Sequence, residues 1–161
     1  GKYWIEGGGG GRPELLVRVD ILMVNDAEAR QLSGEHNLVR AARWIQEHGP
    51  PFVVVKKGEH GAILFGPDWV FFVPGFPLEV IFDPTGAGDS FAGGFRGYLA
   101  SAGSLTPSDL RRAMVYGSVM GSYAVEQFSV NRLVDLPFAD IELRLVEFRD
   151  ITAFETHVQD V

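Results

Sequence analysis

The sequence DPTGAGDSF, residues 83–91, decides how this chain folds and what it binds. It follows an apolar run at residues 80–82 and precedes a segment with helical patterning at residues 91–99. A strand, a glycine-rich turn and a helix in this order bring backbone N–H groups and the positive end of a helix dipole to one point. Phosphate and other anions bind well at such a point. We therefore predict an anion site at this strand-to-helix turn.

The carboxylate in the turn, Asp89, is unusual because a bound anion would repel it. A carboxylate beside a phosphate site can take the proton from a hydroxyl that attacks the phosphate. A plainer alternative is that Asp89 only caps the following helix, since aspartate is a preferred N-cap residue. The residues alone leave both interpretations open.

Two other phosphate-binding loops fit this sequence less well. A dinucleotide-binding turn needs a third glycine, and Phe91 stands at that position. A Walker-type GxxxxGK[ST] loop does not occur in the 161 residues. The sequence thus excludes a P-loop kinase and disfavours a dinucleotide-dependent oxidoreductase.

Residues 83–89 resemble the second signature of the ribokinase (PfkB) carbohydrate kinase family, DTxGAGD, with Pro84 in place of the usual threonine. Two more segments match in the same order. NDAE at residues 25–28 resembles the NxxE of the family, and VVVKKGEHGA at residues 53–62 resembles its strand followed by GxxG. The resemblance implies an α/β fold, a ribokinase-like three-layer sandwich with a mostly parallel sheet and an antiparallel β portion.

The resemblance also implies the chemistry. Asp89 would be the general base for the substrate hydroxyl, and the N–H groups of Gly86, Ala87 and Gly88 would form the anion hole for the transferring phosphoryl group. ATP would be the phosphoryl donor, with Mg²⁺ as cofactor. The acceptor would be a small hydroxylated compound, a sugar or a nucleoside.

Two pairs of residues are assigned to ions by the resemblance. Asn25 and Glu28, one helical turn apart, would lie near the phosphates and Mg²⁺ and act through water. The alternative is that Asn25 caps a short helix and Glu28 is an exposed surface acid. Asp83 and Thr85 match positions where some family members hold K⁺ through backbone carbonyls, and Thr85 is also expected beside the nucleotide.

Four small residues are expected along the nucleotide. Gly58 and Gly61 match the family glycines at this site, although a tight hairpin between two strands would also require glycine. Gly117 and Ser118 lie where the family packs a helix against the adenine. Close helix–helix packing would explain a helical glycine equally well.

The adjacent lysines Lys56 and Lys57 could attract phosphate. Alternation along a strand would place only one of them on the ligand side. The pattern does not say which one, so neither is assigned to the catalytic set.

Hydrophobic periodicity and turn residues predict the remaining elements. Strands are expected at residues 19–24, 52–56, 62–65 and 69–73. Helices are expected at residues 12–18, 26–32, 38–48, 88–102, 108–128 and 138–154. The last helix should bury one edge, formed by Ile141, Leu145, Phe148 and Ile151.

Composition restricts the class of protein. A chain of 161 residues with 46% hydrophobic and 22% charged residues is typical of one globular domain. A net charge of −7 without a basic run argues against nucleic-acid binding. There is no cysteine for a disulfide or a thiolate zinc site, and no membrane span or signal peptide is recognised. A soluble, cytoplasmic protein is expected.

The resemblance covers only the carboxyl-terminal part of the family, which suggests a truncated or engineered chain. The amino-terminal strands, the first glycine-rich signature and the small β lid that carries most sugar contacts have no match. Five glycines at residues 7–11 are expected to form a flexible linker. Exposed sheet edges would favour self-association into a homo-oligomer or binding of a partner chain. The alternative to an active kinase is a catalytically silent nucleotide-binding or scaffold module.

Overall fold

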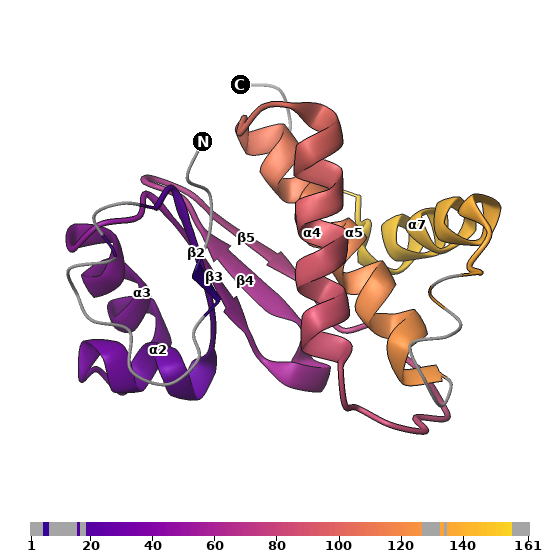
Figure 1. The fold of residues 1–161 in the computed structure, drawn as a ribbon, viewed down its shortest axis with the longest axis horizontal. Coiled ribbons are helices and arrows are strands. Elements are labelled where there is room, and N and C mark those ends of the chain that lie inside the picture. The colour runs from indigo at the N-terminus through magenta and orange to yellow at the C-terminus, as the bar shows by residue number, and fades with distance from the viewer. Residues whose placement is uncertain (1–4, 7–15, 17–18, 127–132, 134, 156–161) are drawn as a thin grey trace.

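The computed structural model describes residues 5–6, 16, 19–126, 133 and 135–155 (Figure 1). The strands are β1 (Ile5–Glu6), β2 (Ile21–Asn25), β3 (Phe52–Lys56), β4 (Ala62–Phe65) and β5 (Val70–Val73). The helices are α2 (Asp26–Ser33), α3 (Leu38–Glu47), the 3-10 turn η1 (Gly58–His60), α4 (Ala87–Ala102), α5 (Pro107–Glu126) and α7 (Phe138–Thr152). The glycine run at residues 7–11 and most of the helix expected at residues 12–18 lie outside the described residues.

The five strands form one sheet in the order of the sequence, β1-β2-β3-β4-β5. β1, β2 and β3 pair in parallel, whereas β3, β4 and β5 pair antiparallel. At the carboxyl ends of the parallel strands, Asn25 on β2 is the register partner of Lys56 on β3. The sheet therefore has the antiparallel β portion expected from the sequence.

Helices cover both faces of the sheet: α2 and α3 lie on one face, and α4, α5 and α7 lie on the other (Figure 1). Neighbouring strand residues alternate between two cores, so Leu22 packs with α2 and α3 whereas Met23 packs with α4 and α5. Burial on both faces explains why β2 and β3 are continuous apolar runs instead of alternating ones. The three-layer α/β architecture is confirmed.

Capping residues close in the sequence mark most of the predicted helix ends. Asn37 caps α3 by accepting the N–H groups of Val39 and Arg40. Gly34 ends α2 with a left-handed φ of 74°. Both ends follow the known preferences of asparagine for N-caps and glycine for C-caps. Among the described residues, no helix is both long and apolar enough to cross a membrane.

Two expectations from the apolar pattern are wrong. Residues 80–82 are not a strand, because residues 74–86 form a loop that leaves the sheet after β5 and crosses to α5. Within that loop the Phe82 N–H donates to the Val125 carbonyl at 2.9 Å, and the Phe82 residue is 56% exposed. Ile151 is 50% exposed, whereas Phe148 is buried and Ile141 and Leu145 are partly buried against the core.

Candidate functional site

A cavity of about 390 Å³ lies among the η1 turn, the loop at residues 74–86, the start of α4 and one face of α5. Its size is in the range of small-molecule sites, roughly 300–1,000 Å³. Five of the residues predicted for the site line it: Gly58, Gly61, Ala87, Gly88 and Ser118. The structure thus brings the GxxG turn, the glycine-rich turn and the middle of α5 to one place.

Among the described residues, no side chain caps the start of α4. Its N-cap residue is Gly86, in the left-handed region with a φ of 84°. The first N–H groups of a helix have no partner within the helix, and here only the Ala87 N–H reaches back, to the Pro84 carbonyl at 3.3 Å. The amino end of α4 therefore presents backbone donors at the wall of the cavity.

Asp89 is the third residue of α4 and is exposed. The simple alternative, that Asp89 is the N-cap, is wrong because Gly86 holds that position. Asp89 does not line the cavity. The carboxylate of Asp89 therefore lies outside the cavity, directly after Gly88, which lines it.

The side chains of Asn25 and Glu28 cap the amino end of α2. Asn25 Oδ1 accepts the Glu28 N–H at 2.7 Å, and Glu28 Oε2 accepts the Asn25 N–H at 2.8 Å. This is a reciprocal capping box, and Glu28 is half-buried instead of exposed. Neither residue lines the cavity. Within the described part of the chain, no group of three or more His, Cys, Asp or Glu side chains could hold a metal ion.

The turn between β3 and β4 is built on backbone contacts. Gly61 has a φ of 88°, and a Cβ there would lie 2.1 Å from the Val73 carbonyl oxygen. Gly75, which the sequence did not single out, lies equally close to the η1 turn. A Cβ added at Gly75 would lie 2.1 Å from the Glu59 carbonyl oxygen. The GxxG turn is thus pressed against the chain that leaves β5, and Gly61 is needed for that contact.

On α5, Ser118 lines the cavity, and its hydroxyl donates to the Pro74 carbonyl at 3.0 Å. Gly117 does not line the cavity. A Cβ on Gly117 would lie 2.9 Å from the Phe91 carbonyl oxygen of α4. Close packing of α5 on α4 therefore explains this glycine.

Asp83 and Thr85 form a small turn before α4. The Thr85 N–H donates to Asp83 Oδ1 at 2.8 Å. Hydrogen bonds from the side chain and the backbone of Thr85 hold the pKa of Asp83 below its usual value. Neither residue lines the cavity, and their role at a K⁺ site stays a prediction.

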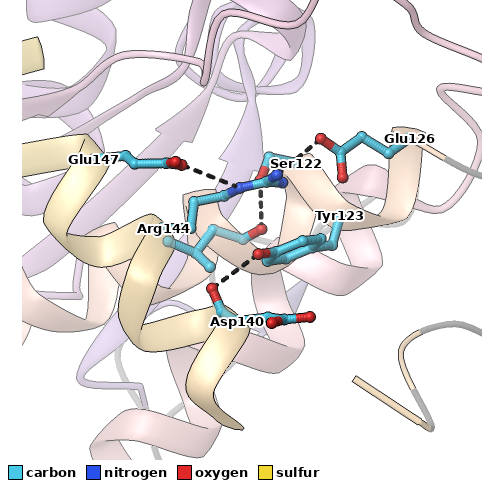
Figure 2. Close-up of polar contacts among 7 residues, drawn as sticks. Ser122, Tyr123, Glu126, Asp140, Arg144 and Glu147 are labelled. Atoms are coloured by element: carbon cyan, nitrogen blue, oxygen red, sulfur yellow. Dashed lines mark hydrogen bonds and ion pairs between the residues drawn. The ribbon is translucent and has the colours of Figure 1, made fainter. Parts of the chain in front are cut away.

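Arg144, which no sequence pattern identified, contacts two residues that line the cavity. Figure 2 shows its guanidinium reaching from α7 to α5, where it donates to Ser122 Oγ at 2.9 Å and Glu126 Oε1 at 2.8 Å. The guanidinium carbon lies 3.6 Å from the centroid of the Tyr123 ring and 4.7 Å from that of Phe76. Because Ser122 and Phe76 line the cavity, Arg144 supports two residues of its wall.

The three-layer α/β fold with a glycine-rich turn at the start of α4 places the chain in the ribokinase-like class of proteins. Residues 12–136 match the pfkB family carbohydrate kinases, and the chain belongs to this family. The aminoimidazole riboside kinase of Salmonella typhimurium is 30% identical over 132 residues, which are 80% of this chain and 40% of that protein. The cytidine kinase of Thermococcus kodakarensis is 39% identical over 84 residues, which are 51% of this chain and 30% of that protein.

Solved structures show the same fold. The aminoimidazole riboside kinase from Salmonella enterica, in complex with aminoimidazole riboside and an ATP analog, superposes with a TM-score of 0.68 at 29% identity. The match covers 88% of this chain and 46% of that one. Ribokinase from Thermotoga maritima gives a TM-score of 0.70 at 26% identity over 86% of this chain and 46% of that one. The chain thus spans less than half the length of these relatives, and the family and fold predictions are confirmed.

Proposed function

We propose that this chain carries the nucleotide site and the general base of an ATP-dependent kinase that phosphorylates the hydroxyl of a sugar or a nucleoside. The observation that carries the proposal is the start of α4, where an uncapped glycine turn borders the cavity and a carboxylate follows in the same helical turn. Relatives named as ribokinase, cytidine kinase and aminoimidazole riboside kinase support the reaction and the acceptor class.

In this proposal, ATP, the backbone N–H groups at the start of α4 and Asp89 each have a separate role. ATP supplies the γ-phosphoryl group, and the cavity would hold the nucleotide. The N–H groups of Gly86, Ala87 and Gly88 would stabilise the negative charge of the transferring group, which is most of what phosphoryl transfer asks of a protein. Asp89, outside the cavity but one residue after Gly88, would accept the proton of the attacking hydroxyl.

The proposed Mg²⁺ and K⁺ sites involve residues that already form hydrogen bonds within the protein. Asn25 Oδ1 and Glu28 Oε2 are both engaged in the capping box of α2, so these residues would contact Mg²⁺ through water. Direct ligands would come from the nucleotide phosphates and further water. Binding of K⁺ at the turn of Asp83 and Thr85 remains part of the proposal.

Replacement of Asp89 by asparagine tests the base. We expect the Asp89→Asn chain to bind MgATP nearly as well as the parent chain in calorimetric titration. Its substrate-dependent release of ADP, assayed over a panel of sugars and nucleosides, should fall about 10²- to 10⁴-fold, the usual contribution of a general base. The matched control is Asp109→Asn, because Asp109 is also an aspartate in the first turn of a helix, α5, and does not line the cavity.

The outcomes separate three cases. Unchanged turnover in the Asp89→Asn chain would remove Asp89 from the mechanism. MgATP binding without ADP release for any acceptor would favour the catalytically silent nucleotide-binding module. Absence of MgATP binding in both chains would favour a scaffold module.

A further inference from the structure

Phe76 is the residue at which helix α7 holds the loop that forms part of the cavity wall. Two α7 side chains one helical turn apart, Arg144 and Phe148, contact its ring. The guanidinium carbon of Arg144 lies 4.7 Å from the centroid of the Phe76 ring, and the centroid of the Phe148 ring lies 5.1 Å from it. Because Phe148 is buried in the core, α7 sets the position of Phe76 in the wall.

The two residues that precede Phe76 are held through their backbone. The Pro74 carbonyl accepts the Ser118 hydroxyl at 3.0 Å. Gly75 passes so close to the Glu59 carbonyl oxygen that an added Cβ would lie 2.1 Å from it. The backbone at the start of the loop therefore has little freedom, and the Phe76 ring depends on its side-chain contacts with α7.

The guanidinium of Arg144 also holds Ser122, a second residue of the cavity wall (Figure 2). It donates to Ser122 Oγ at 2.9 Å, while the Ser122 hydroxyl donates to the Val119 carbonyl at 2.6 Å. The hydroxyl proton and one lone pair are thus both engaged within the protein. Arg144 therefore contributes to the orientation of Ser122 as well as to that of Phe76.

Arg144 occupies this position although one of its donors is unsatisfied. Within the described part of the chain, the buried Nε atom has no hydrogen-bond acceptor, and Glu147 Oε2 lies 3.9 Å from it, beyond hydrogen-bond distance. A buried donor without an acceptor lowers stability. Such a group needs an explanation other than stability, and the contacts of Arg144 with two residues of the cavity wall supply one.

The wall of the cavity offers one aromatic ring to a ligand. Among the described residues, two phenylalanines line the cavity, Phe76 and Phe91. Phe91 is buried in the core, whereas Phe76 is half-buried. Because nucleobases stack on aromatic side chains, the accessible ring of Phe76 suits the base of a nucleotide.

We propose that the base of the nucleotide packs on Phe76, and that Arg144 is the positioning residue that holds Phe76 and Ser122 in place for it. This inference rests on the proposed kinase function and adds α7 to the elements that build the nucleotide site. Arg144 does not line the cavity, so it acts through the two residues that it contacts. Loss of Arg144 should weaken binding of the base and leave the contacts of the phosphates unchanged.

Calorimetric titration with MgATP and with adenosine, which has the base but no phosphates, tests the proposal. We expect Arg144→Met to weaken the binding of both ligands by the same factor, about 10-fold. Phe76→Leu should weaken both by about 10- to 100-fold, the usual contribution of an aromatic ring stacked on a base. In the double variant the loss should be smaller than the product of the two single losses, because Arg144 acts through Phe76.

Two control variants separate positioning from stability. Tyr123→Phe removes the hydrogen bond of 2.8 Å to the Asp140 carbonyl, which joins α5 to α7 beside Arg144, and Tyr123 does not line the cavity. This variant should lower the unfolding temperature and leave both affinities unchanged. Arg149→Met replaces an exposed arginine of the same helix and should also leave both affinities unchanged.

The outcomes decide between the inference and its alternatives. If Arg144→Met fails to fold, Arg144→Lys replaces it, because lysine keeps a cation near Glu126 but lacks the planar group that lies over Phe76. Unchanged adenosine affinity in the folded variant, an equal loss in Tyr123→Phe, or losses that multiply in the double variant overturn the inference and leave the kinase proposal intact. A parent chain that binds neither MgATP nor adenosine overturns both.

Discussion

The first turns of the helices α2 and α4 are stabilised in opposite ways. At α2, Asn25 and Glu28 satisfy each other's backbone N–H groups in a capping box. At α4, Gly86 occupies the N-cap position, and no side chain in the described part of the chain accepts a cap hydrogen bond there. Side chains of the protein thus satisfy the backbone donors at the start of α2, whereas in our proposal the transferring phosphoryl group accepts those at the start of α4.

A helix without a cap has to be held by something else. The close packing of α4 on α5 supplies this support: a Cβ on Gly94 would lie 2.8 Å from the Tyr116 carbonyl oxygen and 2.7 Å from Met120 Cγ. α2 has a side-chain cap, whereas α4 is supported by packing against the helix that follows it, α5. The two helices should therefore respond to different substitutions.

The largest effect is expected at the contact of α4 with α5. Gly94→Ala overpacks this contact, and we expect the free energy of unfolding to fall by about 2 kcal/mol. Gly93→Ala is the matched control, because nothing lies within 4 Å of its added Cβ. That substitution should stabilise α4 by up to about 1 kcal/mol. Urea unfolding of both chains measures the difference, and equal effects would show that packing on α5 does not support α4.

The next largest effect is expected at the cap of α2. Asn25→Ala removes one half of the capping box and should lower the free energy of unfolding by about 1 kcal/mol. Asn37→Ala removes the cap of α3 and should cost a similar amount.

The variants Asn25→Ala and Asn37→Ala also distinguish a helix-capping role of Asn25 from a role in Mg²⁺ binding. If Asn25 contacts hydrated Mg²⁺ as proposed, Asn25→Ala weakens MgATP binding and Asn37→Ala does not. A loss of stability without a loss of MgATP affinity would reduce Asn25 to a helix cap.

The smallest effect is expected at Asp83, in the turn that precedes α4. Hydrogen bonds from Thr85 lower the pKa of Asp83 from its ordinary value of 3.8, so the native state favours the ionised carboxylate. The stabilisation is therefore present above about pH 4 and is lost as the pH falls through the lowered pKa. Titration by NMR from pH 6 to pH 2 should show the Thr85 amide resonance shifting with the Asp83 carboxyl, and no shift in that range would contradict the turn.

Local chemistry made much of this fold predictable. Asn37 and Gly34 mark the ends of helices through caps that involve residues close in the sequence. The strands β3 and β4 follow from apolar runs bounded by glycine and proline. At the site, the motifs located the glycine turn of α4, while the roles of its residues remain to be tested.

Features that depend on contacts between residues far apart in the sequence could not be predicted from local patterns. The run at residues 80–82 is as apolar as a strand, but its neighbours in space are on α5, which the sequence does not reveal. Gly75 is needed because another backbone passes close to it. Of the two adjacent lysines, Lys56 lines the cavity and Lys57 does not, which alternation along the strand could not decide in advance.

Arg144 has a practical consequence for anyone who shortens or fuses this chain. Its side chain is only 11% exposed and forms an ion pair with Glu126 of α5. A design that ends before α7 would leave Glu126 without this cation and expose the faces of the aromatic rings that the guanidinium covers. Tags, fusion partners and surface tethers therefore belong beyond Thr152, where they leave the helix that carries Arg144 in place.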